Sequence, residues 1–464
     1  MSGRILICTV IYSVVVLLAT TAAGAETRTV LVFPFENLSN DRSLDWIGEG
    51  IAELIVEKLQ SEPGLYVFSR DERLAAYEST GIPENATISR ATELKLGWDC
   101  GADWIITGRF SGTAEDFQIA ARVVELEIAG ASKETEAKGK LEDIIPLTNT
   151  VSFDLLRKIS PGTPMLEEEY MARPPTPRSA FENYIRGILS VDPQKRVEFL
   201  QTAVRLHPQY MAAMFQLGRT LYLERDLRTS NQWMEKVSGP NRPQAQFTMG
   251  LNYFYIGDYT RSIVTFRELP QTYDVLLNLG SALSLRGDHA AAIAAWRHAA
   301  ETDPFGSDAF FNIGYASLEE GDLDAAVRNL GESLRLRGRD SEALFLLGSA
   351  YERQGRIDES QRLIAQAARL SQRVERWLTQ PIPRLERLST TASVTKSNEI
   401  WTGTRLARRA RGQNMTSWLE SIQNKIDANL YGEVIRELQD VIRVFPDSSE
   451  ARSLLDEVKR RNFR

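Results

Sequence analysis

The chain has 464 residues, of which 43% are hydrophobic and 25% charged, and these are ordinary values for a folded protein. Its length is sufficient for two or three domains. With 55 basic and 62 acidic residues the net charge is −7. Proteins that bind the nucleic-acid backbone usually carry a basic surplus, so we expect no nucleic acid among the partners.

Residues 1–25 have the pattern of a secretory signal peptide. Arg4 gives a positive start, residues 5–18 are almost wholly apolar, and Ala23-Gly24-Ala25 offers a small-x-small cleavage site. The apolar run is short for a spanning helix, which needs about 20 residues. We predict cleavage and a periplasmic or secreted location. An uncleaved inner-membrane anchor, and hence membrane association, is the alternative.

Residues 26–160 alternate strand and helix patterns. Residues 30–35 are apolar and β-branched, as in a buried strand, and residues 46–59 place apolar side chains at helical spacing. The segments that follow predict strands at 65–68, 104–110, 117–126 and 132–140, and helices at 70–78, 89–98 and 141–159. This order indicates a mixed α/β layer.

Three segments of this region resemble a known family. They are Val30-Leu-Val-Phe-Pro-Phe-Glu-Asn-Leu-Ser39, Trp46-Ile-Gly-Glu-Gly-Ile-Ala-Glu-Leu-Ile55 and Cys100-Gly-Ala-Asp-Trp-Ile-Ile-Thr-Gly-Arg109. They look like the amino-terminal domain of the translocation protein TolB, which has relatives in flagellar and curli assembly factors and in fusions to helical repeats. The resemblance implies an α/β module for protein contact in the cell envelope, with no known chemistry. TolB's β-propeller does not follow here, so its partners are not carried over.

Gly48-Glu-Gly50 invites comparison with a nucleotide-binding loop. Position 53 is Glu rather than Gly, and the segment lies within a predicted helix. We therefore interpret these glycines as a point of close helix approach. Trp46 is interpreted as a core or domain-contact residue.

Residues 161–178 hold five prolines and predict a semi-rigid Pro-rich linker. Residues 179–370 then repeat. Glycines that follow an apolar residue recur at intervals of 32, 30, 34 and 34, at Gly218, Gly250, Gly280, Gly314 and Gly348. A period near 34 predicts stacked helix–turn–helix units, here about six. Pro270 is expected to end one second helix early and so to account for the shortest interval.

The spacing within a unit identifies the type of repeat. Leu279-Gly280 is followed by Ala292, Trp296 and Ala299, and this order of small and large residues resembles tetratricopeptide repeats. The predicted fold is therefore an α/β amino-terminal domain, TolB-like with a mixed sheet and helices, followed by an all-α tetratricopeptide-repeat superhelix. Such arrays expose a concave surface for partners.

Aromatic side chains recur on the first helix of each unit, which lines the inner wall of such an array. They make a candidate partner-binding groove for a peptide or helix of Phe215, Tyr222, Phe247, Phe254, Tyr255, Phe311, Tyr315 and Phe345. The alternative is that this stripe only packs the repeats together. Asn278 and Asn312 suit one position of a clamp for a C-terminal carboxylate. Ser281 and Tyr315 occupy its second position without a lysine, so we do not expect that clamp.

Residues 371–415 break the period and predict an irregular basic connector. Four arginines fall within residues 405–411, where they favour the charged face of a helix, with an acidic partner or lipid head groups as the alternative. Residues 416–464 return to helical spacing and predict one more repeat-like unit with a polar-faced cap.

No pattern in the sequence predicts chemistry. The three histidines lack metal-ligand spacing, Cys100 is the single cysteine outside the signal segment, and no phosphate-loop, zinc-protease or hydrolase motif occurs. We interpret Cys100 as a small buried hydrophobe. We expect no catalytic, cofactor or metal site, and predict a non-enzymatic cell-envelope scaffold that binds protein or peptide partners. The alternative is a membrane-anchored sensory or regulatory subunit whose amino-terminal domain recognises a small ligand or lipid.

Overall fold

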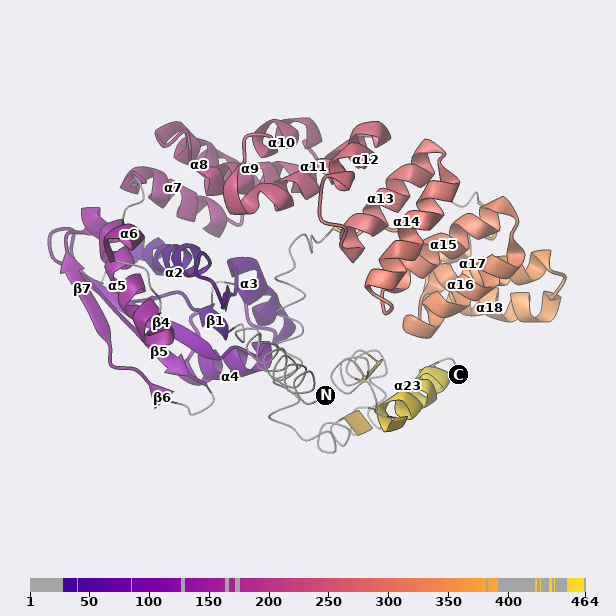
Figure 1. The fold of residues 1–464 in the computed structure, drawn as a ribbon, viewed down its shortest axis with the longest axis horizontal. Helices are drawn as coiled ribbons and strands as arrows, with labels where there is room; N and C mark the ends of the chain where they lie inside the picture. The colour runs from indigo at the N-terminus through magenta and orange to yellow at the C-terminus, as the bar shows by residue number, and fades with distance from the viewer. Residues whose placement is uncertain are drawn as a thin grey trace, which may run out of the picture. The chain divides into compact units, whose positions relative to one another are not determined.

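A computed structural model describes residues 28–39, 41–84, 86–126, 130–162, 167–171, 176–380, 383–390, 422–423, 426, 434–435, 438 and 449–462 (Figure 1). The predicted signal peptide, part of the predicted linker and the arginine run at 405–411 lie outside these residues. Contacts divide the chain into two compact units. The first comprises the described residues up to Leu38, Ile51–Gly139 and Pro146–Met171, and the second comprises Ser39–Gly50, Lys140–Ile145 and the described residues from 176 onward.

The first unit is built on a mixed sheet. β1 (Arg28–Val32) lies between β3 (Leu65–Val67) and β4 (Trp104–Gly112) and is parallel to both. β4 pairs in parallel with β2 (Glu36–Asn37) and antiparallel with β5 (Phe117–Glu125). β5 also pairs antiparallel with β6 (Gly130–Ala131) and β7 (Thr135–Gly139). The predicted mixed sheet is confirmed.

Helices connect or follow the strands, and all but the last of them, which lies in the predicted Pro-rich linker, match helices that the sequence predicts. They are α2 (Trp46–Leu59), α3 (Arg70–Ser79), α4 (Arg90–Cys100), α5 (Ile144–Ile159) and α6 (Glu167–Met171), with short 3-10 turns at Arg42–Leu44 and Leu141–Asp143. Ser89 caps α4 by accepting a hydrogen bond from the Thr92 amide. β1 ends before the predicted strand does, because Pro34 follows two residues later and has no N–H to donate to a sheet.

Ser39–Gly50, which belongs to the second unit, packs against α7 (Arg178–Leu189). The rings of Trp46 and Phe181 meet edge to face with centroids 6.0 Å apart. A Cβ added to Gly50 would lie 3.0 Å from Phe181. The predicted close approach at this glycine is therefore confirmed.

The rest of the second unit is an all-helical array of successive pairs. The first helices are α7, α9 (Met211–Leu223), α11 (Arg242–Ile256), α13 (Tyr273–Arg286), α15 (Ser307–Glu320) and α17 (Ser341–Arg353). Their partners are α8 (Pro193–Leu206), α10 (Leu227–Met234), α12 (Tyr259–Arg267), α14 (His289–Thr302), α16 (Leu323–Leu336) and α18 (Ile357–Leu370). α12 ends three residues before Pro270, as predicted.

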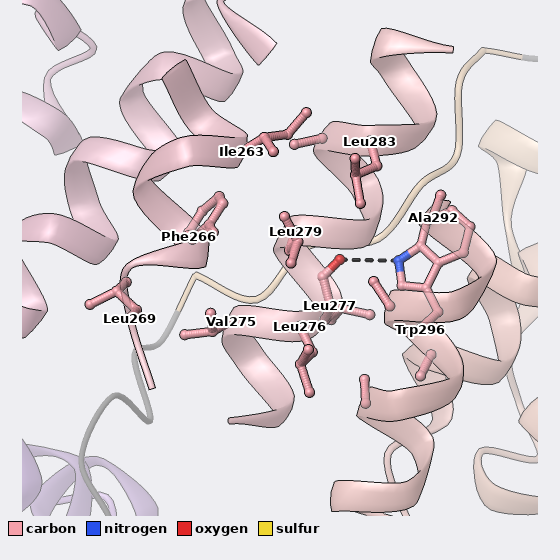
Figure 2. Packing of buried hydrophobic residues seen from close by; sticks show 14 of the residues in the cluster. Ile263, Phe266, Leu269, Val275, Leu276, Leu277, Leu279, Leu283, Ala292 and Trp296 are labelled. Atoms are coloured by element: carbon pink, nitrogen blue, oxygen red, sulfur yellow. Dashed lines mark hydrogen bonds between the residues drawn. The ribbon is translucent and has the colours of Figure 1, made fainter. Parts of the chain in front are cut away.

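The helix pairs contain glycines of two kinds, one at the contact between the helices and one at the turn. A Cβ on Gly280 would lie 2.4 Å from the indole nitrogen of Trp296, which donates a 3.1 Å hydrogen bond to the Leu277 carbonyl (Figure 2). Turn glycines such as Gly287 take a left-handed conformation, with φ 98°, where other residues are strained. Arg225 stands at the turn position of a unit without this glycine and has φ 64°. The glycine period thus reflects helix contact and helix termination.

Beyond the array lie α19 (Gln372–Arg376) and α23 (Ser449–Asn462). A buried cluster joins α23 to earlier positions and consists of Ile422, Ile426, Val434, Ile435, Leu438, Ala451, Leu455 and Val458. Across the part of the chain that the structure describes, no helix combines the length and apolarity needed to cross a membrane.

Candidate functional site

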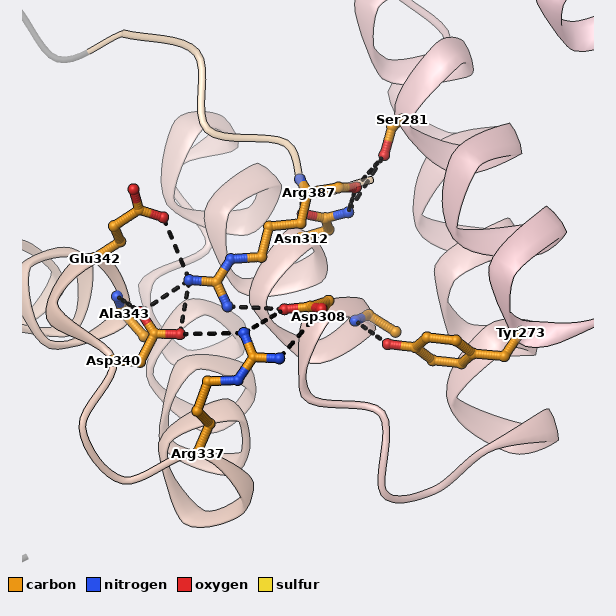
Figure 3. Close-up of polar contacts among 10 residues, drawn as sticks. Tyr273, Ser281, Asp308, Asn312, Arg337, Asp340, Glu342, Ala343 and Arg387 are labelled. Atoms are coloured by element: carbon orange, nitrogen blue, oxygen red, sulfur yellow. Dashed lines mark hydrogen bonds and ion pairs between the residues drawn. The ribbon is translucent and has the colours of Figure 1, made fainter. Parts of the chain in front are cut away.

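Residues 384–389, called here the docked segment, lie across the first helices of three consecutive units (Figure 3). The helices are α13, α15 and α17. The surface they present, called here the α13–α15–α17 face, is formed by Asn278, Ser281, Asp308, Asn312, Asp340 and Glu342. The docked segment falls within the stretch that the sequence predicts as an irregular connector.

Two asparagines bind the backbone of the docked segment. The Asn312 side chain donates to the Arg387 carbonyl at 3.0 Å and accepts from the Arg387 amide at 2.7 Å. Asn278 makes the same pair of bonds with Ser389, at 2.9 and 2.8 Å. In an extended chain, alternate residues present their backbone groups on the same side. The two asparagines therefore bind residues two apart along one edge of an extended segment.

These asparagines have no access to solvent. Asn278, Ser281 and Asn312 are each 0% exposed, and Ser281 donates a further 2.9 Å bond to the Arg387 carbonyl. Leaving a buried polar group without a partner costs about 1–3 kcal/mol. The docked segment removes that cost, because its backbone supplies both a donor and an acceptor to each amide.

Arg387 places its guanidinium among three carboxylates. It lies 2.9 Å from Asp308, 2.7 Å from Asp340 and 3.3 Å from Glu342, and its side chain is 14% exposed. The guanidinium also stacks 3.5 Å from the ring centroid of Phe311. Burial acts to lower the pKa of Arg387, but Asp340 and Asp308 outweigh it and raise the pKa above its ordinary value.

Local helix structure gathers this negative charge. Asp308 and Glu342 lie in the first turns of α15 and α17, where the helix dipole favours carboxylates. Asp340 caps α17 by accepting from the Ala343 amide at 3.0 Å. Arg337 pairs with Asp308 at 2.9 Å, so it shares this carboxylate with Arg387. These carboxylates and arginines therefore form one network of ion pairs, and Arg387 of the docked segment is part of it.

An apolar contact lies two residues before Arg387. Leu385 is buried in a cluster with Phe345 and Trp377, whose rings meet edge to face at 5.4 Å. Glu386 accepts a 3.0 Å bond from Ser284. Burial first, and then Glu386, raises the pKa of Tyr315 to about 12, although a backbone hydrogen bond from Leu385 opposes the shift.

The aromatic residues predicted to line a groove fall into three groups. Phe311, Tyr315 and Phe345 are buried beside the docked segment. On α9 and α11, the ring centroids of Tyr222 and Tyr255 are 6.4 Å apart. The rings of Phe254 and Tyr255 meet edge to face, with their centroids 5.7 Å apart. The remaining two are Phe247, which is buried against Phe266, and Phe215, which is half-buried.

Sequence reasoning passed over the residues that hold the docked segment. It considered Asn278 and Asn312 only for a carboxylate clamp, and these side chains hold an internal backbone instead. A signal was available, because each asparagine lies two residues before its repeat glycine, where the other units have Gln216, Thr248 and Leu346. Arg387 gave no such signal, since it lies 75 residues from Asn312 in a stretch without periodicity.

The first unit holds a separate group of charges on β4, β5 and α4. The Arg109 guanidinium donates two hydrogen bonds to the Glu134 carboxylate, at 2.6 and 2.8 Å. Arg122 lies 4.0 Å from the same carboxylate. Burial raises the pKa of Glu93 to about 7, against the opposing effect of Arg90 and Arg122. Arg109 and Glu134 neutralise each other, which lowers the pKa of Glu134, whereas burial raises the pKa of Glu93.

Comparison with protein families identifies the repeats. Residues 277–331 and 317–379 each match a family model described as tetratricopeptide repeat. Together these matches span the α13–α15–α17 face. The chain therefore carries tetratricopeptide repeats, as the glycine spacing predicts. Comparison with curated proteins finds no match.

Three solved structures are similar to parts of this chain. PilW, titled a widely conserved type IV pilus biogenesis factor, is 16% identical with a TM-score of 0.37, over 44% of this chain and 96% of PilW. MamA from Desulfovibrio magneticus is 18% identical with a TM-score of 0.34, over 36% of this chain and 99% of MamA. YrrB, titled a tetratricopeptide protein with an unusual peptide-binding site, is 16% identical with a TM-score of 0.32, over 38% of this chain and 94% of YrrB.

Proposed function

We propose that this chain is a non-enzymatic scaffold of the cell envelope that binds extended segments of protein partners on the α13–α15–α17 face. One observation carries the proposal. Asn278 and Asn312, both fully buried, each hold the amide and the carbonyl of one residue of an extended chain. Recognition of this kind takes affinity from the backbone and specificity from alternate side chains.

The size of these contacts suits a binding surface. Four amide hydrogen bonds at about 1 kcal/mol each supply about 4 kcal/mol, whatever the sequence of the bound segment. This is far short of the 8 kcal/mol or so of a micromolar complex. Side-chain contacts, such as those that Leu385 and Arg387 make, must supply the difference and with it the choice of partner.

The location in the envelope rests on the amino-terminal sequence. Residues 1–25 have the signal-peptide pattern, and the TolB-like segments resemble modules of envelope proteins. Amino-terminal sequencing of the natural protein tests this directly. Cleavage predicts a first residue of Glu26, and a chain that still begins at Met1 would favour the anchored alternative.

Partner binding is tested by affinity capture from envelope extracts with quantitative mass spectrometry. The test variant is Asn278→Ala with Asn312→Ala, and the matched control is Gln216→Ala with Thr248→Ala, at the same positions of earlier units. We expect the wild-type chain and the control to capture the same proteins and the test variant to lose them. Equal capture by all three chains contradicts the proposed binding face.

A sensory role for the first unit remains the second candidate. Glu93 supports it, because this half-buried carboxyl of α4 interacts with Arg90 and Arg122, and burial raises its pKa to about 7, a combination that also occurs at functional sites. A small ligand that binds there would raise the melting temperature of the wild-type chain and not that of Glu93→Gln. Equal shifts in the melting temperatures of both chains would show that Glu93 takes no part in ligand binding.

A further inference from the structure

We propose that the docked segment is a built-in competitor, and that the partner of the α13–α15–α17 face carries an extended segment with leucine and arginine two residues apart. The inference rests on the proposed function and adds to it the class of ligand and a form of regulation. It begins from the fact that the face already binds such a segment, Leu385-Glu-Arg387, from its own chain.

The requirement for arginine comes from the geometry of the carboxylates. The two terminal nitrogens of Arg387 diverge, one toward Asp308 and the other toward Asp340 and Glu342. A planar guanidinium can make these bonds and stack on Phe311 at the same time, whereas a lysine ammonium is a single point of charge. The face is therefore specific for arginine over lysine.

The requirement for leucine comes from the adjoining cluster of buried apolar side chains. Leu385 packs among Phe345 and Trp377, and it precedes Arg387 by two residues. This is the spacing at which side chains of an extended chain point to one side. At Ser389 the backbone amide and carbonyl both bind Asn278.

The attachment of the docked segment makes it a competitor. α19 ends at Arg376, the described chain continues to Gln380, and only two residues separate it from Pro383. A short tether of this kind gives an effective concentration in the millimolar range. Because the docked segment forms the bonds that a partner would need, a partner must displace it before it can bind.

The test uses the full chain and a fluorescent peptide with the sequence of residues 383–390. In the released variant a Gly-Ser stretch of equal length replaces residues 384–389, and Arg387→Ala is a milder second variant. We expect the released variant to bind the peptide at least about tenfold more tightly than the wild-type chain, with Arg387→Ala in between. Arg384→Ala is the matched control, since Arg384 is 60% exposed and pairs with Glu386; it should bind like the wild type.

Specificity is measured in the released variant. Asn312→Ala should weaken peptide binding about tenfold, because two backbone bonds are lost. A peptide with lysine or alanine in place of its second arginine should also bind about tenfold more weakly, since it cannot form the forked ion pairs. Equal binding of the arginine and alanine peptides would overturn the proposed ligand class.

Two results would overturn the competitor role. One is binding of the peptide by Arg387→Ala and by the released variant no tighter than by the wild type. The other is a released variant that unfolds and is not restored by the peptide, since the docked segment would then be a structural element. Neither result bears on the proposed function, which is tested by capture of partners from envelope extracts. Conversely, a released variant that binds the peptide but captures no envelope protein contradicts the proposed function alone.

Discussion

The two halves of the helical array, α7–α12 and α13–α18, share one framework of helix contacts, and the second half also binds the docked segment. In both halves a glycine on the first helix lies against a large side chain of the second, as Gly250 does with Phe266 and Gly280 with Trp296. Two residues before the glycine the halves diverge. The earlier units carry Gln216 and Thr248 there, and the later units carry Asn278 and Asn312, which hold the docked segment.

This difference shows that the residues of a repeat serve two purposes, which are packing of the helices and binding of a segment. Close contact between paired helices fixes the glycine and its large neighbour in the units from α9 to α18, and neighbouring units cover one another's apolar surfaces. The position two residues before the glycine is left to differ, and on α13 and α15 it is a buried asparagine that binds the docked segment. The periodic residues thus build the scaffold, and departures from the period form the binding surface.

The framework is tested by Gly280→Ala, for which we expect the largest effect. The new Cβ overlaps the Trp296 indole and disturbs its bond to Leu277. Overpacking of this kind costs about 1–3 kcal/mol, and the lost hydrogen bond adds about 1 kcal/mol. Chemical denaturation of the full chain measures the change.

Gly331→Ala on α16 is the matched control. A Cβ at Gly331 meets nothing within 4 Å, so the substitution should stabilise the helix by about 0.5–1 kcal/mol. If both alanines changed stability alike, the repeat glycines would not be explained by close contact.

The binding half is tested by Asn278→Ala with Asn312→Ala. Losing four backbone bonds should free the docked segment at a cost of about 2–4 kcal/mol, and its amides should lose protection. Hydrogen exchange at Arg387 and Ser389 measures this. Protection of these amides should not change in Gln216→Ala with Thr248→Ala. An equal loss of protection in that control would contradict the difference between the two halves.

Arg387→Lys tests how much of the docking depends on the forked ion pairs. Lysine keeps the charge but cannot reach Asp308 and Asp340 together, and we expect a loss of about 1–2 kcal/mol in the stability of the docked state. Limited proteolysis near residues 383–390 reports the release. Arg384→Lys, at an exposed site, should change the cleavage rate little.

The smallest effect is expected at two tyrosines, one in each half. Burial is the main cause that raises the pKa of both Tyr222 and Tyr315 to about 12. A pKa raised above the usual 10 contributes stability that is complete below pH 10 and is lost as the pH rises through 12. Each Tyr→Phe variant should reduce this alkaline loss, by less than about 1 kcal/mol because both groups are partly solvated.

Urea denaturation between pH 8 and 11 measures the effect. Tyr222→Phe and Tyr315→Phe should flatten the pH profile equally, since burial dominates in both. A flattening confined to Tyr315→Phe would show that Glu386 of the docked segment, rather than burial, sets its pKa.

Much of the fold was predictable from local pattern. The apolar spacing of residues 46–59 gave α2 its bounds, Ser89 marked the start of α4, and Pro270 marked the early end of α12. These features depend on residues close in sequence. The strand that was expected at 132–140 begins instead at Thr135, because its register is fixed by pairing with Ala121 of β5.

The candidate site was predictable only in part. Phe311, Tyr315 and Phe345 were singled out by their recurrence, and they lie beside the docked segment. The same recurrence also selected Phe247, which is buried in the core, because helical spacing alone does not separate a side chain facing its own pair from one facing a ligand. Repeat spacing therefore locates the binding helices better than the binding residues.

The sequence by itself determined the repeat, most helix ends and the presence of strands, since each shows in the types and spacing of residues along short stretches of chain. Only the tertiary structure decided that Asn278 and Asn312 hold a backbone and that Arg387 meets Asp308 and Asp340. Those contacts join residues 47 to 111 positions apart. They exist because stacking brings the first helices of three units together, and no local preference encodes where a later, aperiodic stretch of chain will lie.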